Sequence, residues 1–305
     1  MSGLKVEQST RMVQLQDGGR FGVRHLGVTQ GGALDWISMY WANWLLGNPL
    51  SAAVVEITLG GFAATCERDG CLALAGGDLG ATLDDQPLLP WNTFNIRRGQ
   101  RLRFIQARQG ARAYLAAPGG FEAAAMLGSV STVARESLGG LTGNGEPLRQ
   151  GDMLTWQGRS GAPNRVPAAQ VPDYSDMRPL EVVLGAQIGE FSGQSLFDAF
   201  NCSWKVDSRS DRMGVRLIGP ELRSRRGGIV SEGVPLGAIQ VPPDGQPIVL
   251  LNDRQTIGGY PRLGALTPEA VARLGQCLPG TELRLRPIGQ QAAQDAHLRL
   301  LRSWV

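Results

Sequence analysis

Polar side chains able to bind or polarise a small molecule follow directly on one apolar run, Ile248–Leu251, which predicts a buried strand. Asn252 and Gln255 can donate to a carbonyl oxygen, Asp253 can accept a proton, and Tyr260 can stack on a flat ring. Loops held by a rigid strand often carry binding sites. We therefore predict that Asn252 and Asp253 are catalytic and that Gln255 and Tyr260 contact the substrate. The alternative is that these residues only form a turn.

Two further sets of charged and polar residues are candidates for substrate binding. Asp17 and Arg20 lie among glycines, and an ion pair between them would present Arg20 to an anionic substrate. The same pair would equally serve to pin the loop. Arg212 and Gln240 are additional candidates for binding, with Arg212 facing an anion or the other domain. His25 is the only histidine near these motifs, but a lone histidine is more often structural, and we assign it no catalytic role.

A glycine turn precedes the first expected helix. Gln30, Gly31 and Gly32 lead into a segment that Asp35 can cap. Backbone N–H groups beside the positive end of a helix suit a carboxylate or an oxyanion, so we predict that these three residues bind the substrate. A steric requirement for glycine in the turn is the alternative interpretation.

Short strands and a few helices are expected to position these residues. The sequence predicts a helix from Asp35 to about Leu46, whose apolar stripe contains Ile37, Tyr40, Trp41, Trp44 and Leu45. Further helices are expected after Ser192, from Thr267, and over about 291–301. Strands are predicted at 72–75, 81–83, 91–96, 102–106, 113–116, 181–184, 214–218 and 282–288. Their lengths and spacings are typical of a closed or half-closed barrel.

The length of the chain favours two domains. Its 305 residues exceed the roughly 250–300 at which a single hydrophobic core stops growing. Residues 158–179 are rich in proline and polar residues and have no hydrophobic period, which is typical of a linker. We therefore predict an N-terminal domain over 1–157, a linker over 158–179 and a C-terminal domain over 180–305.

Composition excludes several classes of function. A net charge of +3 and scattered basic residues argue against nucleic-acid binding. No apolar run approaches the roughly 18 residues of a membrane span, and we expect a cytoplasmic protein. The four cysteines are dispersed and the histidines number two, so no metal site is predicted. Only Lys5 and Lys205 are lysines, and neither lies in a phosphate-binding loop or a biotin-attachment motif. The chain is therefore expected to carry no covalent biotin, and an ATP-driven step would need a partner.

Four stretches together resemble one family, the biotin-dependent carboxyltransferase-like proteins of the KipA type, known as the C subunits of bacterial 5-oxoprolinases. They occur in the order typical of that family and are QDGGRFGVRHLGVTQGGALDWISMYWANWLLGNPLSAAVVEITLGG (16–61), RESLGGLTGNGEPLRQGD (135–152), SRSDRMGVRLIGPEL (208–222) and SEGVPLGAIQVPPDGQPIVLLNDRQTIGGYPRL (231–263). The family also resembles the carboxyltransferase part of urea amidolyase.

The resemblance implies a mainly β fold with a few helices, in which two cyclophilin-like β-barrel domains pack together. It further implies a subunit of an ATP-dependent 5-oxoprolinase that opens 5-oxoproline to glutamate, with ATP shared by the complex. The implied partners are the other two 5-oxoprolinase subunits, of which the B component is KipI-like and the A component is the third. Two alternatives stay open: carboxyl transfer from carboxybiotin on a separate carrier to a urea-like acceptor, and regulation through binding of a KipI-like kinase inhibitor.

Overall fold

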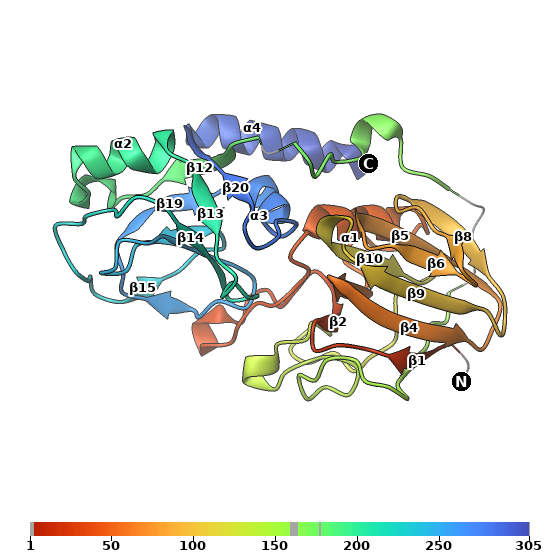
Figure 1. Ribbon diagram of the computed structural model, residues 1–305. Coiled ribbons are helices and arrows are strands. Elements are labelled where there is room, and N and C mark those ends of the chain that lie inside the picture. Colours follow the sequence, from red (N-terminus) through yellow and green to blue (C-terminus); the bar gives the residue numbers. More distant parts are fainter. Residues whose placement is uncertain (1–2, 159–163, 177, 305) are drawn as a thin grey trace. The chain divides into compact units, whose positions relative to one another are not determined.

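The computed structural model describes residues 3–158, 164–176 and 178–304, and it is mainly β with four α-helices among these residues (Figure 1). The expected fold class is confirmed. The chain divides into two compact units: unit 1 contains Met1–Phe21 and Gly31–Ser175, and unit 2 contains Gly22–Gln30 and Asp176–Val305. The segment Gly22–Gln30, which the sequence analysis included in the N-terminal domain, therefore packs with unit 2; we call it the arm.

Unit 1 contains two antiparallel sheets. One has the order β11-β1-β4-β9-β6-β7 and the other the order β2-β3-β10-β5-β8. The strands are β1 (Leu4–Gln8), β2 (Val13–Gln16), β3 (Val54–Thr58), β4 (Gly60–Cys66), β5 (Gly70–Asp78), β6 (Ala81–Leu83), β7 (Gln86–Pro87), β8 (Asn92–Ile96), β9 (Arg101–Gln106), β10 (Gln109–Ala116) and β11 (Met153–Leu154), with 3-10 turns η2 (Ala134–Glu136) and η3 (Ala168–Gln170).

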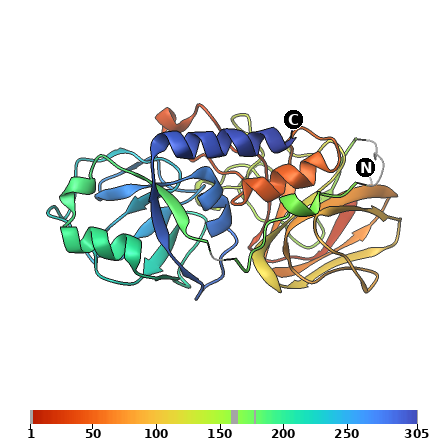
Figure 2. The ribbon, with the colours of Figure 1, turned by 90° about the horizontal axis from the view of Figure 1, so that it is seen from above.

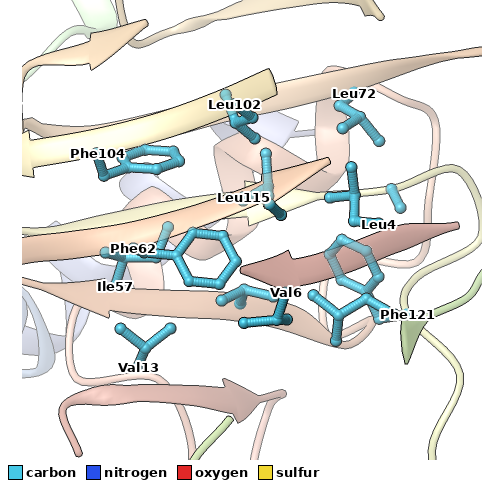
Figure 3. Close-up of a cluster of buried hydrophobic side chains, with 14 of the residues drawn as sticks. Leu4, Val6, Val13, Ile57, Phe62, Leu72, Leu102, Phe104, Leu115 and Phe121 are labelled. Atoms are coloured by element: carbon cyan, nitrogen blue, oxygen red, sulfur yellow. The ribbon is translucent and has the colours of Figure 1, made fainter. Parts of the chain in front are cut away.

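The core of unit 1 lies between strands of both sheets. Phe62 and Phe104, from β4 and β9, contact each other with ring centroids 6.1 Å apart. Figure 3 shows them beside Ile57 from β3 and Leu115 from β10. Removing a phenylalanine from such a core costs about 3–5 kcal/mol, so this cluster accounts for much of the stability of unit 1.

Helix α1 (Trp36–Trp44) contacts β5 and β10. This explains why β5 reads GCLALAGGD, a nearly continuous run of small and apolar residues, instead of alternating polar and apolar ones. Asp35 caps α1 as predicted, and its side chain accepts from the Ser38 N–H at 3.1 Å. The predicted apolar stripe was right for Trp41 and Leu45, which are buried, and wrong for Ile37, Tyr40 and Trp44, which are only partly buried. The buried side of the helix contains Ser38, Met39, Trp41, Ala42 and Asn43.

The second half of the predicted linker is bound along unit 1. The Val166 N–H donates to the Trp91 carbonyl at 3.0 Å, and the Thr93 N–H donates to the Asn164 carbonyl at 3.0 Å. At its other end, the Tyr174 hydroxyl donates to Asp35 at 3.1 Å. Residues 164–175, which we call the strap, are therefore a fixed part of unit 1.

Unit 2 contains one large sheet with the order β20-β13-β14-β17-β16-β19-β12-β21 and a two-stranded ribbon, β15-β18. Only β12 and β21 pair in parallel within the large sheet as the structure describes it. The strands are β12 (Leu180–Leu184), β13 (Trp204–Val206), β14 (Gly214–Ile218), β15 (Glu232–Gly233), β16 (Ala238–Gln240), β17 (Ile248–Leu250), β18 (Ile257–Gly258), β19 (Arg262–Leu266), β20 (Glu282–Leu283) and β21 (Leu285–Ile288).

Three helices belong to the described part of unit 2, and both views show α2 and α4 flanking its strands instead of passing between them (Figures 1 and 2). They are α2 (Gly193–Asn201), α3 (Pro268–Leu274) and α4 (Gln290–Leu301), with 3-10 turns η1 (Arg24–Leu26), η4 (Ile188–Glu190) and η5 (Arg302–Trp304). Ser192 and Thr267 cap α2 and α3 as predicted, through the Ser195 and Ala270 N–H groups. The predicted strand over 282–288 is divided into β20 and β21.

Candidate functional site

The loop after β17 is a buried polar segment of unit 2. Asn252, Asp253 and Arg254 are only 6%, 7% and 3% exposed. Backbone hydrogen bonds hold the loop. The Leu251 N–H donates to the Met213 carbonyl at 2.8 Å, and the Asp253 N–H donates to the Arg212 carbonyl at 2.9 Å. The predicted strand and the predicted polar loop therefore both form, and three consecutive polar residues are shielded from solvent.

Arg212 and Asp253 form a bidentate ion pair. Arg212 Nε donates to Asp253 Oδ2 at 2.9 Å, and Nη2 donates to Oδ1 at 3.0 Å. The side chains are 15% and 10% exposed. Two parallel hydrogen bonds fix the orientation of both groups. Because the guanidinium already binds a carboxylate, Arg212 is suited to orienting Asp253 more than to holding an anionic substrate.

Arg254 and Arg24 form a second arginine cluster, which the sequence analysis missed. The Val234 carbonyl accepts from Arg24 Nη2 at 2.6 Å and from Arg254 Nε at 3.1 Å. Arg24 also donates to Thr256 O and Arg254 to Leu251 O, at 3.0 and 3.1 Å. Burial, with the nearby charge of Arg24, lowers the pKa of Arg254 to about 9. Burial also lowers the pKa of Arg24. Both shifts show that these positive charges lie in an unfavourable environment.

The arm supplies further contacts to this loop. Gln30 Oε1 accepts from Arg254 Nη2 at 3.4 Å, and the Thr29 hydroxyl donates to the Arg254 carbonyl at 3.4 Å. Figure 1 shows the short 3-10 turn of the arm, in the red of the N-terminal region, beside β15. Gln30 therefore lies at the polar loop, as part of its support.

Gln240 lies in β16 and is 3% exposed. Its Nε2 is buried and donates to no atom of the described residues. A Cβ atom on Gly258 would lie 2.7 Å from this Nε2 and 3.1 Å from Val234 Cγ2, so the glycine leaves space for the amide. Of the other predicted ligands, Gln255 is half-buried and Tyr260 is 43% exposed.

In unit 1, Asp17 and Arg20 bind different partners, contrary to the ion pair proposed from the sequence. Asp17 accepts from the hydroxyls of Ser129 and Ser131, both at 2.5 Å. Arg20 is fully buried and donates to the carbonyls of Met126 and Ser131 at 3.0 and 2.7 Å. Both side chains thus fix the 126–131 loop, which favours the structural interpretation of this pair.

The glycine turn before α1 is closely packed. A Cβ on Gly31 would lie 3.2 Å from Arg20 Nη1, and one on Gly32 would lie 3.2 Å from the Gly18 carbonyl; both residues have positive φ. The next two N–H groups, of Ala33 and Leu34, donate to the Asp17 carbonyl and to Glu56 Oε2. These contacts support the steric interpretation of Gly31 and Gly32, because the neighbouring donors are already bound within unit 1.

The sequence carried a signal for only one member of the missed arginine cluster. Arg254 lies in the polar run itself, but an arginine flanked by polar residues is usually exposed to solvent. Its sequence context therefore did not indicate that it is buried. Arg24 lies 232 residues before Thr256, its partner, so no local pattern connects them. His25, to which no role was assigned, is exposed in the arm. Among the residues that the structure describes, no group of three or more His, Cys, Asp and Glu residues is arranged for a metal ion, and no helix has the length and apolar character of a membrane span.

A mainly β fold of two units, with a buried polar loop in the second, defines the structural class of this protein. A family model described as "Carboxyltransferase domain, subdomain A and B" matches residues 26–287. The chain belongs to this carboxyltransferase domain family.

Relatives with known names agree with this family. The chain is 36% identical to the C subunit of 5-oxoprolinase from Escherichia coli, over 90% of this chain and 87% of the relative. It is 31% identical to the C subunit of 5-oxoprolinase from Haemophilus influenzae, over 92% and 89%. The crystal structure of Kluyveromyces lactis urea amidolyase matches 99% of this chain with a TM-score of 0.93 and 27% identity, although the chain spans only 20% of that protein.

Proposed function

We propose that this protein is a component of an ATP-dependent 5-oxoprolinase that opens the cyclic amide of 5-oxoproline to give glutamate. The observation that carries the proposal is the likeness to two 5-oxoprolinase C subunits along nearly the whole of each chain. The buried polar loop after β17 supports it, since a small polar lactam needs oriented donors and acceptors in a shielded position. The proposed partners are the KipI-like B component and the A component of the same enzyme, in the cytoplasm.

Within this proposal, the loop binds and orients the substrate. The Asn252 amide donates to the lactam carbonyl and polarises it, and Asp253, held by Arg212, accepts the lactam N–H. Gln255 and Tyr260 contact the ring from less buried positions. Arg20 and Arg212, which the sequence predicted to bind an anionic substrate, are not assigned to the substrate carboxylate. Both guanidiniums are bound to protein acceptors.

ATP would activate the lactam oxygen, and we assign its binding to a partner protein. The residues of this chain do not fit an ATP site of the phosphate-loop type, since its two lysines follow no glycine-rich loop. We therefore derive no step in this chain through ATP.

The experiment is ATP-dependent glutamate release from 5-oxoproline, measured for the chain alone and for the chain co-expressed with its partner subunits. Activity only in the co-expressed sample is the expected result. A stable complex without activity would refute the proposal.

The assignment of Asn252 is tested in the same assay. Asn252→Ala is expected to lower kcat at least tenfold while the complex still assembles, because the polarising donor is lost. Asn95→Ala, at an exposed position of β8, is the matched control and should retain full activity. Unchanged activity of N252A in an intact complex would show that Asn252 is not catalytic.

A second candidate function is carboxyl transfer from carboxybiotin to a urea-like acceptor, favoured by the structural match to urea amidolyase along the whole chain. It requires a biotin carrier on another protein. A carboxylated biotin carrier mixed with the chain should lose its carboxyl group faster when urea is present. An equal rate with and without urea would exclude this candidate.

A further inference from the structure

Arg254 is buried and Arg24 is partly buried, and neither positive charge has a negative partner in the described part of unit 2. Arg24 and Arg254 both donate to the Val234 carbonyl. Every other acceptor that they bind is also a backbone carbonyl or a side-chain amide oxygen. Within the described ranges, neither guanidinium lies within 4.0 Å of an Asp or Glu carboxylate. Buried charges are normally paired, because taking an ion out of water is costly. The cluster therefore has an excess of positive charge.

The same place also has an excess of hydrogen-bond donors. Arg24 Nη1 and Gln240 Nε2 are both buried, and neither has an acceptor among the described residues. Both lie near Val234: its carbonyl accepts from Arg24, and a Cβ on Gly258 would lie 3.1 Å from Val234 Cγ2 and 2.7 Å from Gln240 Nε2. A ligand that supplied acceptor oxygens and a negative charge would satisfy both deficits.

We propose that Arg24, Arg254 and Gln240 form a binding site for the carboxylate of a small organic acid. A carboxylate has two oxygens with several lone pairs and matches the planar fork of a guanidinium. The carboxylate receives charge-assisted hydrogen bonds from Arg24 Nη1 and a further one from the Gln240 amide. Arg254 contributes its charge while it keeps its carbonyl contacts.

The β15-β18 ribbon provides the route of entry. It has two residues in each strand and is the smallest sheet among the described residues. Gly258, on β18, lies directly over the Gln240 amide, and Thr256, just before β18, binds Arg24. Since the donors at Arg24 Nη1 and Gln240 Nε2 are shielded from solvent, a carboxylate reaches them when this ribbon moves outward. Arg262 and Gln187 hold the ribbon through Glu232, and Arg262 also donates to the Gly233 carbonyl, so these are the contacts that break when it opens.

The identity of the acid rests on the proposed function: it is 5-oxoproline, whose ring carries a single carboxylate. The probes are therefore sodium 5-oxo-L-proline; 2-pyrrolidinone, which is the same ring without the carboxylate; and sodium acetate. Binding is measured by isothermal titration calorimetry on the full chain, alone and in the co-expressed complex. 5-Oxoproline is expected to bind at least tenfold more tightly than 2-pyrrolidinone.

Two variants localise the binding. Gln240→Leu keeps the volume but removes the amide, and Gly258→Ala places a methyl group against Gln240 Nε2. Each is expected to weaken carboxylate binding at least fivefold. Gly233→Ala is the matched control on β15, because a Cβ there meets no atom within 4 Å, and it should bind as the natural chain does. The Tm of Q240L should be equal or higher, since a buried donor without an acceptor is removed.

The outcomes separate this site from the proposed function. Acetate binding that depends on Gln240, without binding of 5-oxoproline, would keep the carboxylate site and refute the proposed substrate. Equal affinities for 5-oxoproline and 2-pyrrolidinone would overturn the site. So would carboxylate binding that Q240L and G258A leave unchanged, or the absence of any carboxylate binding.

Discussion

Arg20 shows how a single buried side chain can organise a loop. Its guanidinium donates to backbone carbonyls of Met126, Ser129 and Ser131, more than a hundred residues away. Gly139 is also part of this arrangement, because a Cβ there would lie 2.4 Å from Arg20 Nη2. The charge of Arg20 thus serves to satisfy carbonyl groups that are shielded from water.

The first residue-scale prediction concerns Arg20→Ala. The variant leaves buried carbonyls without donors, so the free energy of unfolding should fall by about 3 kcal/mol or more in urea denaturation. Arg11→Ala, at an exposed position, is the control and should change it by less than about 0.5 kcal/mol. If R20A were as stable as the natural chain but inactive, Arg20 would be a substrate ligand after all.

The second residue-scale prediction concerns the pair of Arg212 and Asp253. Asp253→Asn leaves a largely buried guanidinium without its counter-charge and should cost about 3–5 kcal/mol of stability. Adding Arg212→Met should restore part of that loss, with a coupling energy of about 1–3 kcal/mol in a double-mutant cycle. The exposed pair of Arg178 and Asp176 should couple by less than about 1 kcal/mol. Additive losses at the buried pair would show that the two side chains act independently.

Among the elements, the strap shows that a proline-rich, aperiodic segment can be firmly bound. Its composition predicts a linker, yet residues 164–175 bind β8 and the start of α1. Trp91, just before β8, has a φ of 70°, an unusual value for a bulky residue, and its ring lies 6.4 Å from that of Tyr174. This backbone conformation places the Trp91 carbonyl against Val166.

The element-scale prediction follows from Tyr174. Tyr174→Phe removes the hydroxyl that contacts Asp35 and Ser38 and should destabilise the strap by about 1 kcal/mol. Limited digestion with trypsin should then cut after the exposed Arg165 several times faster, as detected by mass spectrometry. Tyr260→Phe, which removes a hydroxyl far from the strap in the sequence, is the control and should leave the cleavage rate unchanged. An unchanged cleavage rate would mean that the other contacts hold the strap alone.

Local chemistry explains which elements could be predicted from the sequence. The caps at Asp35, Ser192 and Thr267 act within three residues, so the starts of their helices were predicted correctly. The buried side of α1 was predicted only in part, because β5 and β10, far along the chain, decide it. The polar loop after β17 is a local pattern and was predicted. The partners of Arg20 and Arg24, and the contact of Arg254 with Gln30, lie far along the chain and were not.

At the scale of the whole molecule, the arm makes unit 2 discontinuous. Unit 2 takes Gly22–Gln30 from the N-terminal region, and the contacts of Arg24, Thr29 and Gln30 with the polar loop are spread along that segment. A domain boundary drawn only at the linker therefore leaves unit 2 without part of its own structure.

The whole-molecule prediction is that a fragment of residues 176–305 is incomplete. Its Tm, measured by circular dichroism, should rise by several degrees when a peptide of residues 20–32 is added in excess, because the peptide binds only the folded fragment. A peptide with Arg24→Ala and Thr29→Ala is the control and should have little effect. Equal melting with and without the natural peptide would show that the arm contributes no stability.

The position of the arm has a consequence during synthesis on the ribosome. Arg24 emerges early, yet its acceptor at Thr256 is made 232 residues later. The larger part of unit 1, Gly31–Ser175, is translated in that interval, so unit 1 can fold first, since domains fold as they emerge. The polar groups of the arm stay hydrated until the residues of unit 2 that bind them have been translated. Closing so long a loop is slow, and we expect unit 2 to complete its folding after unit 1.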